Sequence, residues 1–143
     1  MSKIKIYLGD LEHTWEKVNT WTFPLNVGYV GTYAKKNIPN DVDVTLFKDP
    51  FELIELVKKE PPDIVGLTFY VWSRNLAGKV MEIVKEINSN ILTVGGGPEF
   101  TNLNYDNETA KEFFNGMGKF CDSFIVNQGE KGFLEILKNY IDV

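Results

Sequence analysis

Residues 64–69 read Ile-Val-Gly-Leu-Thr-Phe, a short apolar run that ends in a hydroxyl and an aromatic ring. A run of this length and composition predicts a β-strand that is covered by helices on both faces. Residues 91–94, Ile-Leu-Thr-Val, repeat the pattern, and residues 4–8 and 42–47 give two further strands rich in branched side chains. A weaker fifth strand is predicted at residues 123–126. Strands buried on both faces are typical of a parallel sheet.

Helical segments alternate with these strands. The segment 50–59 opens with an N-cap, a proline and a capping-box acid, and the proline pair at 61–62 ends it. Residues 75–88 carry an apolar stripe with helical spacing. The remaining helices are predicted at residues 24–36, 108–114 and 133–140. The alternation predicts an α/β fold of three layers, a five-stranded parallel sheet of the flavodoxin-like or Rossmann-like type with strand order 2-1-3-4-5.

Length and charge narrow the class of protein. The 143 residues fit one domain, residues 1–143. The net charge of −5 argues against a nucleic-acid partner, which needs a surplus of Lys and Arg. The single cysteine, Cys121, and the single histidine, His13, exclude an internal disulfide and metal sites built from several such ligands. No signal peptide is recognisable, and the longest near-apolar run, residues 64–72, is too short to cross a membrane. We expect a soluble cytoplasmic protein.

The loops that follow the strands should hold any ligand. In a sheet of this order, ligands bind beyond the carboxyl ends of the strands, where the order reverses. The loop after the first strand, residues 9–14, has one glycine instead of G-x-G-x-x-G, and the triphosphate loop G-x-x-x-x-G-K-[ST] is absent. A phosphoacceptor domain would carry an aspartate where Thr68 or Phe69 ends the third strand. The missing motifs argue against a binding site for a dinucleotide or a nucleoside triphosphate. The missing aspartate argues against a phosphoacceptor domain.

Three consecutive glycines, Gly95 to Gly97, follow the fourth strand and precede Pro98. Without side-chain bulk, a flat or extended ligand can approach the backbone and meet its amides. The alternative is a tight turn that needs a positive φ, for which one glycine suffices. Both interpretations stay open.

The third strand ends in Thr-Phe-Tyr-Val-Trp, residues 68–72. Aromatic rings at the point where a chain leaves the sheet form an apolar floor beside a pocket. We expect Phe69 to belong to the core and Trp72 to line a pocket or an interface.

Three polar residues in the loops are further candidates. His13 could ligate a metal or donate a hydrogen bond, and it could equally bond to the backbone. Glu130 opens the last helix, where the helix dipole stabilises a carboxylate without any ligand. An enzyme that acts alone with Asp10, His13 and Glu130 as acid–base groups is disfavoured, because no nucleophile–base pair is recognisable.

Taken in order, these motifs resemble the N-terminal cobalamin-binding-type domain of radical S-adenosylmethionine enzymes. The matching segments are residues 10–14, 22–28, 62–68, 70–73, 95–99 and 122–130. The resemblance implies that the nucleotide tail of a cobalamin slides between the strands and the helices. It implies that Thr68 hydrogen-bonds this tail and that Gly95 and Gly96 make room for it. The corrin ring would lie over the strand ends, near residues 70–72 and the loop of His13.

The resemblance supplies a set of candidate site residues. The cofactor-binding residues that it implies are Asp10, His13, Thr14, Thr68, Tyr70, Trp72, Gly95, Gly96, Gly97, Pro98, Gly129 and Glu130. It implies no catalytic residue. In the motif D-x-H-x-x-G the histidine ligates cobalt, but in this chain the histidine comes one place late and no glycine follows. His13 is therefore not assigned as a ligand of cobalt.

The resemblance also implies a partner domain. Radical S-adenosylmethionine enzymes hold a [4Fe–4S] cluster with C-x-x-x-C-x-x-C in a barrel, and this chain has one cysteine. We expect the cluster and S-adenosylmethionine in an adjoining domain, so the chain is not catalytic alone. It would present the corrinoid to that barrel, in cis as the N-terminal part of a larger enzyme or in trans as a separate domain, for methyl transfer or related radical chemistry. The alternative is a cobalamin-free interaction domain of the same fold.

Overall fold

The computed structural model describes residues 2–13, 24–103, 105 and 107–142. Five parallel strands form one sheet in the order β2-β1-β3-β4-β5. The strands are β1 (Ile4–Gly9), β2 (Val42–Phe47), β3 (Ile64–Thr68), β4 (Leu92–Gly96) and β5 (Ser123–Phe124). The predicted parallel sheet and its strand order are therefore confirmed.

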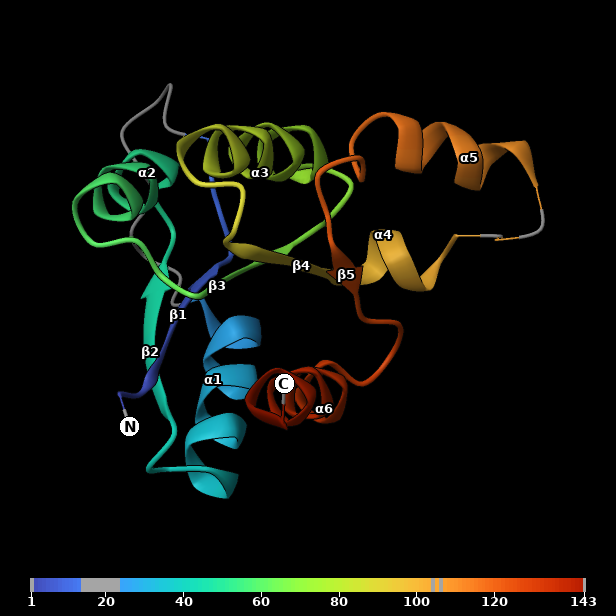
Figure 1. The fold of residues 1–143 in the computed structure, drawn as a ribbon. Coiled ribbons are helices and arrows are strands. Elements are labelled where there is room, and N and C mark those ends of the chain that lie inside the picture. The colour runs from blue at the N-terminus through green and yellow to red at the C-terminus, as the bar shows by residue number, and fades with distance from the viewer. Residues whose placement is uncertain (1, 14–23, 104, 106, 143) are drawn as a thin grey trace.

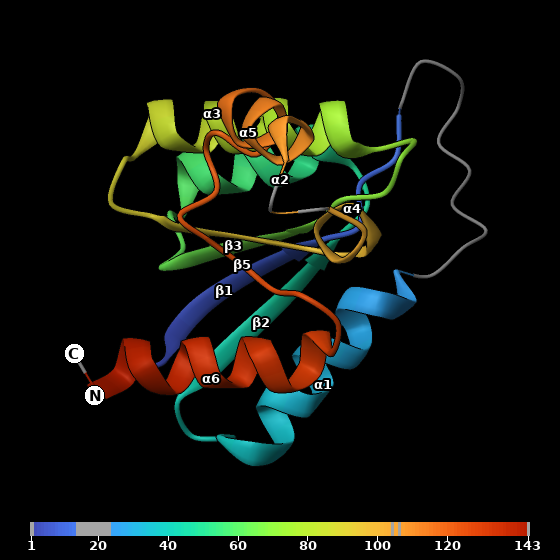
Figure 2. The same ribbon diagram turned by 90° about the vertical axis from the view of Figure 1, so that its right-hand side faces the viewer.

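Helices cover both faces of this sheet. The helices are α1 (Leu25–Asn37), α2 (Pro50–Lys59), α3 (Arg74–Ile87), α4 (Pro98–Thr101), α5 (Glu108–Asn115) and α6 (Gly129–Asp142). Figures 1 and 2 show α2, α3 and α5 on one face and α1 and α6 on the other, which gives three layers. The predicted start of α2 is confirmed, because the backbone N–H of Phe51 donates to the Asp49 carboxylate at 2.8 Å.

Strand β3 lies at the centre of the sheet and every one of its residues is buried. Its side chains alternate between the two layers, as in any strand. Val65 and Leu67 pack in the cluster with α2 and α3, whereas Ile64 packs in the cluster with α1 and α6. Thr68 and Gly66 therefore face the α1 and α6 layer, and this orientation positions the site.

Two details differ from the sequence prediction at the end of β4. The strand continues through Gly95 and Gly96, which pair with Leu67 and Thr68, so these glycines do not form the following loop. The helix α4, which starts at Pro98, was not predicted, because four residues are too few to show helical spacing. β5 has two residues where four were predicted, and these two pair with Val94 and Gly95 of β4.

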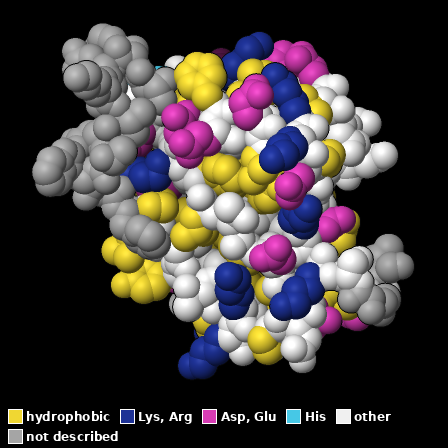
Figure 3. Space-filling view, turned by 90° about the vertical axis from the view of Figure 1, so that its left-hand side faces the viewer, with side chains coloured by type: hydrophobic (Ala, Val, Ile, Leu, Met, Phe, Trp, Pro, Cys, Tyr) yellow, Lys and Arg dark blue, Asp and Glu magenta, His cyan; other side chains and the backbone are white. Residues whose placement is uncertain are grey.

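The surface agrees with the mixed charge of the sequence. On the face that carries the β2 edge of the sheet, acidic and basic side chains lie interspersed (Figure 3). Among the residues that the structure describes, no helix is both long and apolar enough to span a membrane.

Candidate functional site

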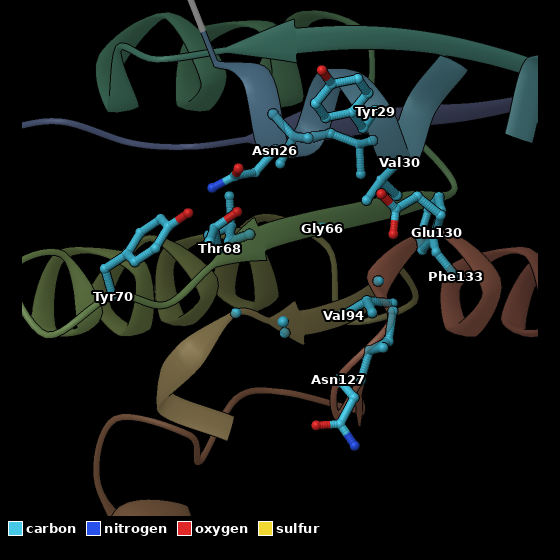
Figure 4. A pocket seen from close by; sticks show the side chains of 18 residues that line it. Asn26, Tyr29, Val30, Gly66, Thr68, Tyr70, Val94, Asn127, Glu130 and Phe133 are labelled. Carbon is cyan, nitrogen blue, oxygen red and sulfur yellow. The ribbon is translucent and has the colours of Figure 1, made fainter. Parts of the chain in front are cut away.

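A groove of about 270 Å³ lies on the α1 and α6 face of the sheet (Figure 4). Its floor is made by strands, and its lining residues there are Leu8, Gly66, Leu67, Thr68, Val94, Gly95 and Gly96. One wall is α1, with Asn26, Val27, Tyr29 and Val30. The other wall is the segment from β5 into α6, with Ile125, Asn127, Gly129, Glu130 and Phe133. Tyr70 and Gly97 complete the lining beside the end of β3.

Gly96 leaves the floor of the groove open. In the register of β3 and β4, Gly96 pairs with Thr68 and Val94 pairs with Gly66. Since side chains alternate along a strand, these four positions share the groove face. Among the described residues, a Cβ atom on Gly96 would meet nothing within 4 Å. At Gly66 the space is already used, because a Cβ there would lie 2.7 Å from the Leu8 side chain.

The neighbours of Gly96 have other roles. A Cβ on Gly95 would point to the opposite face, 2.6 Å from Cε2 of Phe100 and 3.0 Å from Sγ of Cys121. Gly97 has φ of 100°, and a Cβ on it would lie 3.0 Å from the Phe69 carbonyl oxygen. Gly95 thus accommodates a core ring and Gly97 makes the turn into α4. The expectation that the missing side chain of Gly95 makes room for a ligand was wrong, although its backbone lines the groove.

Polar groups gather at one end of the groove, which we call the mouth and which comprises Asn26, Thr68 and Tyr70. Figure 4 shows the polar ends of these three side chains directed to the same end of the groove. Thr68 is buried, yet its hydroxyl makes no hydrogen bond within the described parts of the chain. Burial and the charge of Asp10 raise the pKa of Tyr70, so its hydroxyl keeps its proton and can donate. The mouth therefore offers neutral hydrogen-bonding groups to a ligand.

The opposite end of the groove is apolar except for one carboxylate. Val30 and Phe133 lie there, and Figure 4 shows Glu130 beside Val30 with its carboxylate directed toward the groove. A Cβ on Gly129 would lie 3.4 Å from Val30, so the start of α6 packs closely against α1 at this end. The two helices thus meet at this end of the groove.

Asp10, His13 and Trp72 lie at the strand ends but do not line the groove. Nε2 of His13 lies 3.2 Å from the Trp72 carbonyl oxygen, a contact in which the ring nitrogen donates. The Trp72 ring is 67% exposed and stacks on Tyr70, with centroids 4.6 Å apart. Burial raises the pKa of Asp10, Lys48 opposes that shift and Glu12 adds to it. These groups form a partly apolar rim that adjoins the mouth through Tyr70.

The structure brings together seven of the twelve residues that sequence reasoning proposed. Those that line the groove are Thr68, Tyr70, Gly95, Gly96, Gly97, Gly129 and Glu130. Pro98 is exposed as the first residue of α4 and lies away from the groove lining. Thr14 lies outside the described residues. Among the described residues, no group of three or more His, Cys, Asp or Glu side chains could hold a metal ion.

Sequence reasoning missed the wall that α1 contributes. Asn26, Tyr29 and Val30 recur with the spacing of one helix face, a signal that was present in the sequence. This spacing alone did not identify the wall, because the sequence does not show which face of α1 lies toward α6. Asn127, also missed, has φ of 68°, a left-handed conformation that asparagine tolerates better than most residues.

Comparisons with known proteins point to one family. The B12 binding domain family model matches residues 15–116. The chain is 30% identical over 128 residues to the cobalamin-dependent radical SAM methyltransferase TokK of Streptomyces tokunonensis, covering 84% of this chain and 17% of that protein. It is 29% identical over 119 residues to 2-(S-pantetheinyl)-carbapenam-3-carboxylate methyltransferase of Streptantibioticus cattleyicolor, with 80% and 16% covered. The chain therefore spans about a sixth of the length of these curated relatives.

Solved structures share the fold. A cobalamin-binding protein from Desulfitobacterium hafniense superposes with a TM-score of 0.66 at 16% identity, covering 96% of this chain and 58% of that one. The cobalamin-dependent S-adenosylmethionine radical enzyme OxsB gives 0.60 at 16% identity, covering 96% of this chain and 19% of that one. The receiver domain of NtrC4 from Aquifex aeolicus gives 0.63 at 10% identity, covering 99% and 98%. At these identities the likeness concerns the fold alone.

Proposed function

Because this chain belongs to the B12 binding domain family, we propose that the groove between α1 and α6 holds the nucleotide tail of a cobalamin. The observation that carries the proposal is the open space over Gly96, next to the Thr68 hydroxyl that has no hydrogen bond among the described residues. A site of this kind accepts an elongated group along the strands, and the hydroxyl fixes its position. The residues present therefore fit a nucleotide tail.

Each part of the groove suits a part of that tail. Leu8, Val94 and Phe133 form an apolar floor on which a planar lower base is removed from water. The neutral donors of the mouth suit the phosphodiester, which needs hydrogen bonds. The corrin ring is too large for a groove of about 270 Å³. It would stay outside, beside Tyr70 and the exposed ring of Trp72.

We further propose that the chain presents this corrinoid to a radical SAM catalytic domain, in the same polypeptide or in another one. Relatives that match most of this chain carry methyltransferase names. A bound corrinoid supplies methyl-transfer chemistry at its cobalt. The residues of this chain would bind the tail, orient the ring and keep water from the buried base. The [4Fe–4S] cluster and S-adenosylmethionine would belong to the catalytic domain.

The experiment is retention of a chromophore. The purified protein is mixed with hydroxocobalamin, and gel filtration separates bound from free corrinoid. We expect visible absorption to travel with the protein peak. A folded protein that stays colourless under micromolar conditions would contradict the proposal and would favour the cobalamin-free interaction domain.

A further inference from the structure

Glu130 carries the one carboxylate among the described residues that line the groove. It lies at the end away from the mouth, beside Val30 and Phe133 (Figure 4). Its side chain is half-buried and makes no ion pair or hydrogen bond with any part of the chain that the structure describes. The described residues that line the groove include no Lys, Arg or His that would neutralise it.

The carboxylate of Glu130 is half-buried, so water still solvates part of it. An ionised carboxylate accepts hydrogen bonds and donates none. The N-terminus of α6 stabilises its charge, but a side chain that points to solvent would gain the same stabilisation. A ligand that fills the groove removes water from the carboxylate, and that loss is costly unless the ligand returns a hydrogen bond.

We propose that Glu130 determines specificity within the groove by accepting a hydrogen bond from a donor on the nucleotide tail. This inference rests on the proposed function, since it assumes that the tail occupies the groove. Glu130 also repels the anionic phosphodiester of the tail. The phosphodiester is therefore held at the mouth, near Asn26 and Thr68, and the base end of the tail lies toward Glu130.

Two parts of a nucleotide tail carry such a donor. The ribose offers a hydroxyl in every corrinoid that has a complete tail. The base offers an N–H only when it is of the adenine type, because neutral dimethylbenzimidazole has no N–H once it is joined to the ribose. Cobalamin and an adenine-base analogue therefore distinguish the two sources.

The test is the dissociation constant of each corrinoid for the wild-type protein, Glu130→Ala and Glu130→Gln, measured by calorimetry. The matched control is Glu135→Ala on the same helix, whose carboxylate is exposed and pairs with Lys138 at 3.1 Å. For Glu130→Ala we expect affinity about ten- to a hundredfold weaker, the effect of losing a hydrogen bond to a charged group. Glu130→Gln keeps an acceptor oxygen and should lose less, and the control should not change.

The outcomes separate the alternatives. Equal weakening of both corrinoids by Glu130→Ala identifies the ribose hydroxyl as the donor, and weakening of the adenine analogue alone identifies the base. Unchanged or tighter binding of both corrinoids by Glu130→Ala overturns the inference, while the proposed function stands. A wild-type protein that binds neither corrinoid overturns the proposed function itself and this inference with it.

Discussion

Thr68 on β3 and Gly96 on β4 are register partners, and both face the space between α1 and α6. Thr68 contributes the hydroxyl of a buried residue, and Gly96 contributes the absence of a side chain. A glycine in the interior of a strand weakens the strand and often marks a bulge, a bend or a site of ligand approach. Among the described residues, no atom lies within 4 Å of the missing side chain of Gly96, and this is the space that the proposed nucleotide tail would occupy.

Filling this space should block the tail. Gly96→Val would place a branched side chain in the open groove next to Thr68. We expect cobalamin affinity to fall at least about tenfold, a loss of about 1.4 kcal/mol, in a spectroscopic titration. The control is Thr45→Val, which changes an exposed residue of the edge strand β2 and should leave the affinity unchanged. Equal affinities in both variants would place the ligand elsewhere.

Removing the hydroxyl should weaken binding without harming the fold. Thr68→Val keeps the shape of the side chain, and no hydrogen bond among the described residues is lost. We expect affinity for cobalamin to fall about three- to tenfold, as for one neutral hydrogen bond. The midpoint of urea unfolding should not decrease. Thr68→Ser should retain wild-type affinity, and a loss there equal to that of Thr68→Val would contradict the role of the hydroxyl.

Substitution by alanine should change the stability of the protein differently at the adjacent positions Gly95 and Gly96. Gly95→Ala would bring a methyl group 2.6 Å from Cε2 of the fully buried Phe100, an overpacking that costs about 1–3 kcal/mol of unfolding free energy. Gly96→Ala adds the same group where nothing lies within 4 Å. We expect urea unfolding to show destabilisation for Gly95→Ala and none for Gly96→Ala. Equal destabilisation would refute the assignment of the two glycines to opposite faces.

Cys121 should be chemically inert in the native state. Burial raises the pKa of its thiol to about 12, with a further contribution from Asp122, and Sγ lies 3.1 Å from Sδ of Met81. Iodoacetamide should therefore modify the unfolded protein much faster than the native protein at mildly alkaline pH. Because the unfolded thiol ionises near pH 9.0 and the folded thiol does not, the contribution of this group to stability falls as pH rises from about 9 to about 12. Rapid native labelling would contradict this environment.

The strand order was predictable because the apolar runs at residues 64–69 and 91–94 mark central strands and right-handed crossovers then restrict the topology. The family resemblance supplied Thr68 as a site residue, and the strand predicted at residues 64–69 placed Thr68 within one residue of its end. The separate roles of Gly95, Gly96 and Gly97 could not be predicted. Side-chain alternation tells which face of the sheet a residue lies on only if that residue belongs to the strand. β4 ends at Gly96, two residues beyond the predicted end.

Cobinamide, which carries the corrin ring without the nucleotide tail, gives the sharpest comparison with cobalamin. If the tail occupies the groove over Gly96, cobalamin should bind the wild-type protein at least about a hundredfold more tightly than cobinamide does, a difference of about 2.8 kcal/mol. The Gly96→Val substitution should reduce that difference by weakening cobalamin alone. Equal dissociation constants of the two corrinoids for the wild-type protein would show that the groove does not hold the tail.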